Sequence, residues 1–322
     1  MKKKIIKIIL FFKKPIDLIL SFLIFPAAIL LLIYRRFGSI RLPLTTKILK
    51  RLGIFPIRNH YYEPLFDDRL IKEPLSKDRN LPGINLNVSG QLNFLKDFFC
   101  SQELIDLKLD NIANKNNFYI NNATFKSGDA EYYYQIIRAI KPNKIIEIGS
   151  GNSTKVALLA LQKNKKETGT TSKLICIEPY EKLWLDNLNI EVYRKPLQNL
   201  EFDWNKELNS GDILFIDSSH IIRPQGDVLK EYLEILPKLK QGVIIHIHDI
   251  FTPKDYLSKW IVEKVLFWNE QYLLEAMLSN TNRYEIIGAL NFLKHNYYDE
   301  LKKVCPYLTE DKEPGSFYIK II

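Results

Sequence analysis

Short apolar runs alternate with helical patterns along the second two thirds of the chain. Each run is four to seven residues long and is bounded by turn signals, as strands of a buried parallel sheet are. The pattern predicts strands at Lys144–Ile148, Leu174–Ile177, Ile190–Tyr193, Ile213–Ile216, Val243–Ile247, Tyr284–Leu290 and Ser316–Ile321.

Helical periods fill most of the intervals between these strands. We expect helices at Ala130–Ile140, from Lys155 to Gln162, from Asp227 to Leu236 and around Tyr256–Leu278. The last two strands are joined by a polar stretch without a clear crossover helix, so they are expected to pair antiparallel. The chain is therefore predicted to form a doubly wound, mostly parallel, seven-stranded α/β sheet.

A different pattern occupies the N-terminus. Ile16 to Tyr34 is a run of 19 residues whose one charge is Asp17, and as a helix it would be about 28 Å long, close to the hydrocarbon thickness of a bilayer. Both a single span and a bent, re-entrant helix fit this run. We favour the bent form, because Pro26 near its middle removes a backbone donor and both flanks are basic.

Charge is concentrated around that apolar run. The chain carries +9 overall, while residues 1–60 carry eight Lys, five Arg and one acidic residue, so 13 − 1 = +12 and the remainder carries 9 − 12 = −3. A nucleic-acid-binding protein would carry its basic surface on the folded domain. Basic flanks beside an apolar helix instead favour a membrane with anionic lipid and a catalytic domain that faces the cytoplasm. Three distant cysteines fit a reducing compartment.

These changes in pattern suggest three segments. Residues 1–41 form a basic-flanked membrane anchor, and residues 42–115 form an interfacial helix near Thr45–Leu52 and a proline-rich connector. Residues 116–322 form the α/β domain.

The chemistry-bearing residues follow the predicted strands. Gly149 and Gly151 come directly after the first strand, and Glu178 ends the second, 29 residues after Gly149. Glycines allow a sharp turn and a close approach, and an acid at the second strand can accept hydrogen bonds from both ribose hydroxyls of an adenosine. This arrangement predicts a cofactor that contains adenosine.

A dinucleotide is the less favoured cofactor. Its fingerprint has a third glycine where this chain has Thr154. The turn offers Asn152, Ser153 and Thr154 instead, and these side chains suit an amino-acid carboxylate and helix capping better than a diphosphate.

The segments EIGSGNST, IEP, DILFIDSSH and PGSFYIKI together resemble the class I S-adenosylmethionine-dependent methyltransferase family, and most closely its bacterial branch with a GSGNST first motif. The resemblance covers roughly Phe118 to Ile322 and implies the Rossmann-like strand order 3-2-1-4-5-7-6 with the last strand antiparallel. It implies S-adenosylmethionine as cofactor, with Glu178 at the ribose, Gln198 at the adenine and Asp217 at the methionine portion or the acceptor. The first motif supplies the other expected cofactor-binding residues: Glu147, Gly149, Ser150, Gly151, Ser153 and Thr154.

Histidines and aspartates gather after the fourth and fifth strands. Three interpretations of Asp217, His220, His248 and Asp249 stay open. Asp217 and Asp249 could hold a divalent cation such as Mg²⁺. His220 or His248 could act as a general base on an acceptor hydroxyl, with Asp217 beside it. Alternatively, these side chains only satisfy buried hydrogen bonds, which is the interpretation we favour for His246.

The sequence therefore predicts a membrane-anchored methyltransferase that modifies a hydroxyl of a small-molecule, glycan or lipid-linked acceptor. Two alternatives are other chemistry on the same fold, since relatives that resemble cephalosporin hydroxylase have a similar layout, and a non-catalytic membrane-tethered binding module.

Overall fold

The computed structural model describes residues 2–60, 62–111, 118–180 and 183–322, with side chains described from residue 13 onward. The chain divides into two compact units, Met1–Lys72 and Glu73–Ile322, which are described separately. The predicted division after residue 41 stays a prediction, and the one after residue 115 lies outside the described residues.

The first unit is dominated by one long helix. Helix α1 runs from Lys2 to Phe37 without interruption at Pro15 or Pro26. Within it, Lys13–Phe37 is long and apolar enough to cross a membrane, and none of its most apolar window is buried in the protein. The expected break at Pro26 is therefore wrong. A proline removes one backbone donor, and the apolar residues on both sides keep the helical path.

The chain then turns back along the end of α1. Helix α2, Pro43–Arg51, begins with a proline at its first position and matches the predicted helix within two residues. The Tyr34 hydroxyl hydrogen-bonds Thr46 Oγ1 at 2.6 Å. Arg35 pairs with Glu63 and lies 4.7 Å from the centre of the Phe55 ring. These contacts fix α2, Phe55 and Glu63 against the C-terminal turn of α1.

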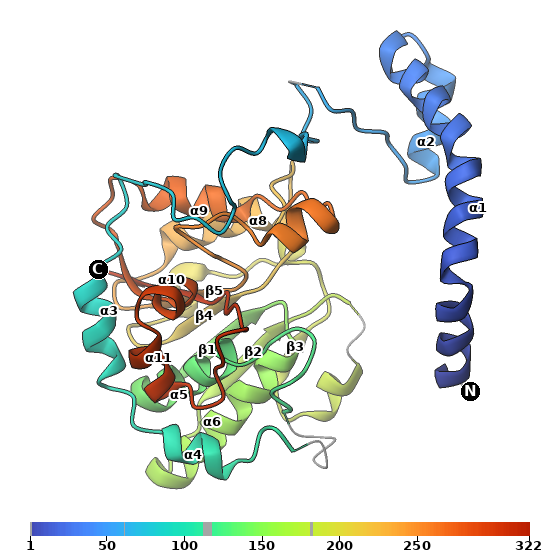
Figure 1. Ribbon diagram of the computed structural model, residues 1–322. Helices are drawn as coiled ribbons and strands as arrows, with labels where there is room; N and C mark the ends of the chain where they lie inside the picture. The colour runs from blue at the N-terminus through green and yellow to red at the C-terminus, as the bar shows by residue number, and fades with distance from the viewer. Residues whose placement is uncertain (1, 61, 112–117, 181–182) are drawn as a thin grey trace. The chain divides into compact units, whose positions relative to one another are not determined.

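The second unit contains a seven-stranded sheet in the order β3-β2-β1-β4-β5-β7-β6 (Figure 1). Strands β1 to β5 pair in parallel, and β7 pairs antiparallel with both β5 and β6. The predicted order and the antiparallel last strand are confirmed. The strands are β1 Lys144–Ile148, β2 Lys173–Ile177, β3 Glu191–Tyr193, β4 Ile213–Ile216, β5 Ile244–Ile247, β6 Tyr284–Ala289 and β7 Phe317–Ile321.

Both faces of the sheet are covered. Successive side chains of a strand point to opposite faces, so Ile145 enters one core and Ile146 the other. Helices α5, Asp129–Ile140, and α6, Asn152–Thr168, cover the Ile145 side, whereas α8, Asp227–Lys230, and α9, Glu270–Leu278, cover the other (Figure 1). This burial on two sides explains why the strands read as unbroken apolar runs.

Shorter elements complete the unit. The remaining helices are α3 Val88–Leu95, α4 Ser101–Asp106, α7 Trp204–Glu207, α10 Leu290–Asn296 and α11 Tyr298–Val304, with π-helical turns at Glu231–Ile235 and Lys259–Glu263. Turns of 3₁₀ helix lie at Asp68–Leu70 in the first unit and at Leu183–Asn187, Leu197–Asn199 and Leu236–Lys238 in the second.

One helix prediction needs correction. The stretch expected to be helical around Tyr256–Leu278 is interrupted, because Val265 takes a left-handed conformation that no helix continues through. Trp260 and Trp268 therefore do not share one helix, but their rings still pack 5.0 Å apart. The connection between β6 and β7 contains α10 and α11, two helices of seven residues each, and the two strands pair antiparallel as predicted.

Candidate active site

In the turn after β1, the backbone at Gly149 lies very close to the backbone at Asp217. Gly149 has φ +78°, and a Cβ there would overlap the carbonyl oxygen of Asp217. Its amide donates to Ile177 at 3.0 Å, while the Asp217 amide donates to Ile148 at 2.8 Å. Glycine is required here because both the conformation and the space exclude a side chain. The contact joins the carboxyl ends of β1, β2 and β4.

Glu147 supports this turn from behind. Its fully buried carboxylate accepts a hydrogen bond from Thr154 Oγ1 at 2.5 Å and one from the Tyr133 hydroxyl at 3.3 Å. Thr154 Oγ1 in turn accepts the Gly151 amide at 3.0 Å. Burial raises the pKa of Glu147 to about 7, against hydrogen bonds that lower it. Glu147 thus holds the first turn of α6 in position.

Glu178 lies where β2 ends and connects two loops. Its two carboxylate oxygens accept the amides of Ser150 at 3.1 Å and Tyr180 at 3.0 Å. Glu178 therefore holds the loops that follow β1 and β2 together.

A cavity of about 170 Å³ opens at the carboxyl ends of β1, β2 and β4. This is where the order of the strands reverses, and in open α/β sheets ligands bind at such a point. Four of the residues predicted to bind the cofactor line it: Gly149, Glu178, Gln198 and Asp217. The other five, Glu147, Ser150, Gly151, Ser153 and Thr154, form the β1–α6 turn or the support behind it and are not among its lining residues.

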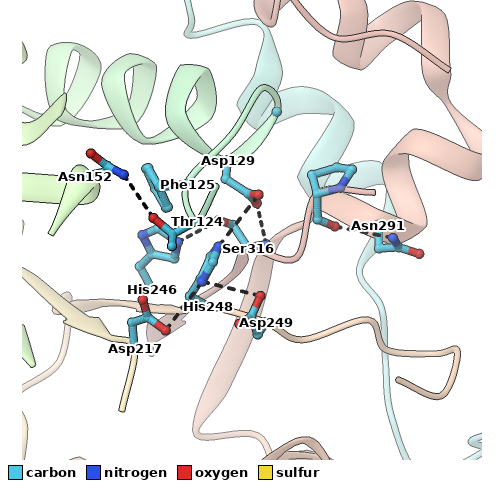
Figure 2. Close-up of polar contacts among 12 residues, drawn as sticks. Thr124, Phe125, Asp129, Asn152, Asp217, His246, His248, Asp249, Asn291 and Ser316 are labelled. Atoms are coloured by element: carbon cyan, nitrogen blue, oxygen red, sulfur yellow. Dashed lines mark hydrogen bonds and ion pairs between the residues drawn. The ribbon is translucent and has the colours of Figure 1, made fainter. Parts of the chain in front are cut away.

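Beside this cavity, the ends of β4 and β5 carry a cluster of titratable groups. Asp217, His248 and Asp249 each present a ligand atom, and these atoms lie within 4.8 Å of one another. Figure 2 shows the His248 ring between the two carboxylates, with Nδ1 3.5 Å from Asp217 Oδ1 and 3.5 Å from Asp249 Oδ1. Because β4 and β5 are parallel neighbours, their carboxyl ends bring these residues together.

His220 joins the cluster from the loop after β4. Its Nε2 lies 3.3 Å from Asp217 Oδ1 and 3.7 Å from Asp249 Oδ2. Its Nδ1 is 2.8 Å from Glu270 Oε2, and a carboxylate there requires the proton on Nδ1. The ring also packs against Trp268, with centroids 4.3 Å apart. His220 and Asp249 both have positive φ, a conformation that is costly for such residues and often found at functional sites.

The surrounding charges set the pKa values of the cluster. Burial alone would lower the pKa of His220 and His248, but the nearby carboxylates raise both well above the usual value. Burial would raise the pKa of Asp217, yet the two histidines hold it below its usual range. For Asp249 burial prevails and raises the pKa to about 6.

His246 has a different environment. It lies inside β5, where Nε2 is 2.8 Å from Ser316 Oγ and the ring stacks on Tyr318 at 4.1 Å. Burial lowers its pKa well below the usual value. His246 is a core side chain, as the sequence suggests.

Two carboxylates of the site were missed by sequence analysis. Asp129 lies behind His248, with Oδ2 3.7 Å from its Nε2, while Asp129 Oδ1 accepts the Ser316 amide at 2.7 Å. Glu270 lies behind His220 and also accepts the Tyr232 hydroxyl at 3.0 Å. They start helices α5 and α9, far from β4 and β5 in the sequence, and no motif marks either position.

Fold and site together define a Rossmann-like α/β domain with a cavity where the strand order reverses, beside an acid–histidine cluster. Residues 146–250 match the family model described as a methyltransferase domain. An uncharacterized protein of Archaeoglobus fulgidus is 30% identical over 172 residues, which are 50% of this chain and 76% of that protein. The chain therefore belongs to the same family as the Archaeoglobus protein, and residues 146–250 form a methyltransferase domain.

Solved structures give more distant matches. The CmcI apo-structure is 15% identical, with a TM-score of 0.35, over 62% of this chain and 72% of that one. The O-methyltransferase from Bacillus cereus in complex with SAH is 13% identical, with a TM-score of 0.34, over 71% of this chain and 90% of that one.

Proposed function

We propose that this protein is a methyltransferase that binds S-adenosylmethionine in the cavity at the ends of β1, β2 and β4 and methylates a hydroxyl of its acceptor. The observation that carries the proposal is the convergence of Gly149, Glu178, Gln198 and Asp217, from three strand ends and one loop, on a single cavity. An acid at the end of the second strand suits the two ribose hydroxyls of an adenosine.

The first turn of α6 favours S-adenosylmethionine over a dinucleotide. Residues Asn152, Ser153 and Thr154 begin this helix, so their backbone amides and hydroxyls lie at its N-terminus. An amino-acid carboxylate is stabilised by such a helix end. The segment Gly149–Thr154 also supports placing the protein in the bacterial branch with the GSGNST motif.

The cluster beside the cavity supplies the groups that methyl transfer to oxygen requires. S-adenosylmethionine, when bound, supplies a methyl group on a positively charged sulfur. Transfer forms a C–O bond, breaks the C–S bond with its electron pair left on sulfur, and releases the hydroxyl proton. His220 Nε2 is the proposed acceptor of that proton. Glu270 holds Nδ1 protonated and the ring fixed, and a cation bound by Asp217 and Asp249 would offset the negative charge that otherwise keeps Nε2 protonated.

Asp217, His248 and Asp249 are proposed to hold a divalent cation that lowers the pKa of the acceptor hydroxyl. A bound cation would displace the proton from Nδ1 of His248, so that one buried nitrogen and two carboxylates become its ligands. This assignment extends the pair Asp217 and Asp249, expected from the sequence, by one histidine.

The N-terminal helix supports a membrane-associated acceptor, such as a glycan intermediate or a lipid-linked molecule. Its apolar length fits a bilayer, and the basic residues at its C-terminal end, Arg35, Arg36 and Arg41, fit anionic headgroups on the cytoplasmic side. The catalytic unit is proposed to face the cytoplasm, where S-adenosylmethionine is made.

Calorimetric titration of the detergent-solubilised full chain with S-adenosylhomocysteine tests the cofactor assignment. We expect micromolar binding, weakened about 10- to 100-fold by Glu178→Ala, because two charge-assisted hydrogen bonds are lost. Glu234→Ala, an exposed glutamate outside the site, is the matched control. Absence of binding to a folded chain, or equal binding by Glu178→Ala, would contradict the assignment.

A further inference from the structure

The cation site that we propose contains a nitrogen donor that magnesium sites seldom have. His248 is 4% exposed, and its Nδ1 makes no hydrogen bond to any residue that the structure describes. That nitrogen points between Asp217 and Asp249 (Figure 2). A buried polar atom without a hydrogen bond is costly, so its position calls for a ligand.

The distances fit coordination better than direct hydrogen bonding. His248 Nδ1 lies 3.5 Å from a carboxylate oxygen of each aspartate. A charge-assisted hydrogen bond would be about 2.7–2.9 Å long. Two ligand atoms that each lie about 2.1 Å from one metal ion in tetrahedral geometry are about 3.4 Å apart. His248 Nδ1 is therefore spaced from each carboxylate as two ligands of one ion are, and the ligand atoms of all three residues lie within 4.8 Å of one another.

A second carboxylate, Asp129, faces the other nitrogen of the ring at ion-pair distance, and its charge favours the proton on that nitrogen. Asp129 Oδ2 lies 3.7 Å from His248 Nε2, on the side of the ring away from the aspartates, and Asp129 is itself held by the Ser316 amide. A carboxylate behind a histidine is the usual outer support of a metal-binding imidazole, because it holds the proton on the remote nitrogen and leaves the other lone pair for the metal.

We infer that Asp217, His248 and Asp249 bind a first-row transition-metal ion, of the Mn²⁺, Fe²⁺ or Zn²⁺ class, in preference to Mg²⁺. The inference deepens the proposed function, because it specifies the cation of that same site. Mg²⁺ prefers oxygen ligands and octahedral geometry. Imidazole suits transition metals, and the two carboxylates, with no cysteine in the group, exclude a soft thiolate site. The Mg²⁺ expected from the sequence does not fit the nitrogen donor.

The test compares Mn²⁺ and Mg²⁺ binding to the metal-free full chain. Calorimetry gives both affinities, and electron spin echo spectra of bound Mn²⁺ detect the ¹⁴N of a coordinated imidazole. We expect Mn²⁺ to bind at least about 100-fold more tightly than Mg²⁺ and to show the ¹⁴N coupling. Asp129→Asn should weaken Mn²⁺ binding about 10- to 100-fold by removing the outer support.

Variants of His248 distinguish coordination of the ion by the imidazole nitrogen from simple electrostatic attraction by the two aspartates. His248→Gln should abolish the ¹⁴N coupling, and His248→Glu should shift the preference toward Mg²⁺ by about tenfold or more. His295→Gln, at a histidine that pairs with Glu313 away from the cluster, should change neither.

S-adenosylhomocysteine binding, measured on the same samples, shows that each variant is folded. Three results would overturn the metal inference alone, provided that S-adenosylhomocysteine still binds. They are no Mn²⁺ uptake, equal affinities for Mn²⁺ and Mg²⁺, and a ¹⁴N coupling that survives in His248→Gln. The cluster would then be an ion-pair network of imidazolium and carboxylate groups. Loss of S-adenosylhomocysteine binding by the folded wild-type chain would contradict the proposed function instead.

Discussion

His220 and Asp249 have unusual backbone conformations at the centre of the site. Both have φ near +60°, a region that costs a residue with a side chain about 1–2 kcal/mol. The hydrogen bond from His220 to Glu270 and the packing on Trp268 hold the first residue in place. In this conformation the side chains of His220 and Asp249 approach each other and Asp217 at the carboxyl ends of β4 and β5.

This strain predicts a difference between two substitutions at one position. Asp249→Gly and Asp249→Ala both remove the carboxylate, but glycine accepts a positive φ without cost. We expect the glycine variant to be more stable than the alanine variant by about 1 kcal/mol, measured by denaturant unfolding. All four tryptophans lie in the second unit, so their fluorescence reports on its unfolding. An alanine variant of equal or greater stability would show that no strain resides at Asp249.

Glu147 makes stability depend on pH. Burial raises its pKa from 4.5 to about 7, so below pH 4.5 it is protonated in both folded and unfolded chains. Between pH 4.5 and 7 the unfolded chain loses this proton first, and the free energy of unfolding falls as pH rises, by about 3 kcal/mol in all. Glu147→Gln should remove this part of the decrease, which denaturant unfolding at pH 5 and pH 7.5 measures.

The comparison needs a control for the other titrating groups. Glu234→Gln changes an exposed carboxylate and should leave the pH dependence as in the wild type. If Glu147→Gln and the wild type lost the same stability between the two pH values, Glu147 would have an ordinary pKa.

Residues at strand ends were predictable, and those that support them were not. Gly149, Glu178 and Asp217 each follow an apolar run directly, so their position at one edge of the sheet follows from the parallel topology. Asp129 and Glu270 reach the site from the first turns of two helices. Their role depends on how those helices pack, and a linear pattern does not contain that information.

At the scale of elements, the strands agree with the sequence more closely than the helices do. A short apolar run bounded by turn signals indicates a strand that is buried on both faces. The observed bounds of β1 and β4 are the predicted ones. Helical periods persist across local breaks. The interval from Tyr256 to Leu278 keeps a helical pattern in the sequence although Val265 interrupts the helix. Trp260 and Trp268, on either side of that break, still pack against each other.

Helix α1 predicts a membrane-bound protein. Phe22 and Ile29 are exposed on the candidate span, near its middle. Replacing both with Asp should cost about 5–7 kcal/mol of membrane insertion and move the chain to the soluble fraction after carbonate extraction. Leu233→Asp, at an exposed leucine of the second unit, should leave the distribution unchanged. A wild-type chain that is extracted by carbonate would contradict the anchor.

At the scale of the whole molecule, the two units differ in charge, in exposed apolar surface and in the site residues that they contain. The first concentrates positive charge and exposed apolar surface, and the second carries the sheet, the cavity and the acid–histidine cluster. Every residue that we assign to cofactor, cation or proton transfer belongs to the second unit. The proposed function of the molecule therefore depends most on which ligand binds in the cavity at the ends of β1, β2 and β4.

The most direct test maps that binding site by photo-cross-linking. The full chain is irradiated with 8-azido-adenine S-adenosylmethionine, digested, and sequenced by mass spectrometry. We predict label on the peptides that contain Tyr180 or Gln198, suppressed by S-adenosylhomocysteine and not by NADH, because both residues line the cavity beside Glu178. Label confined to peptides outside the cavity, or suppression by NADH in place of S-adenosylhomocysteine, would contradict the central claim.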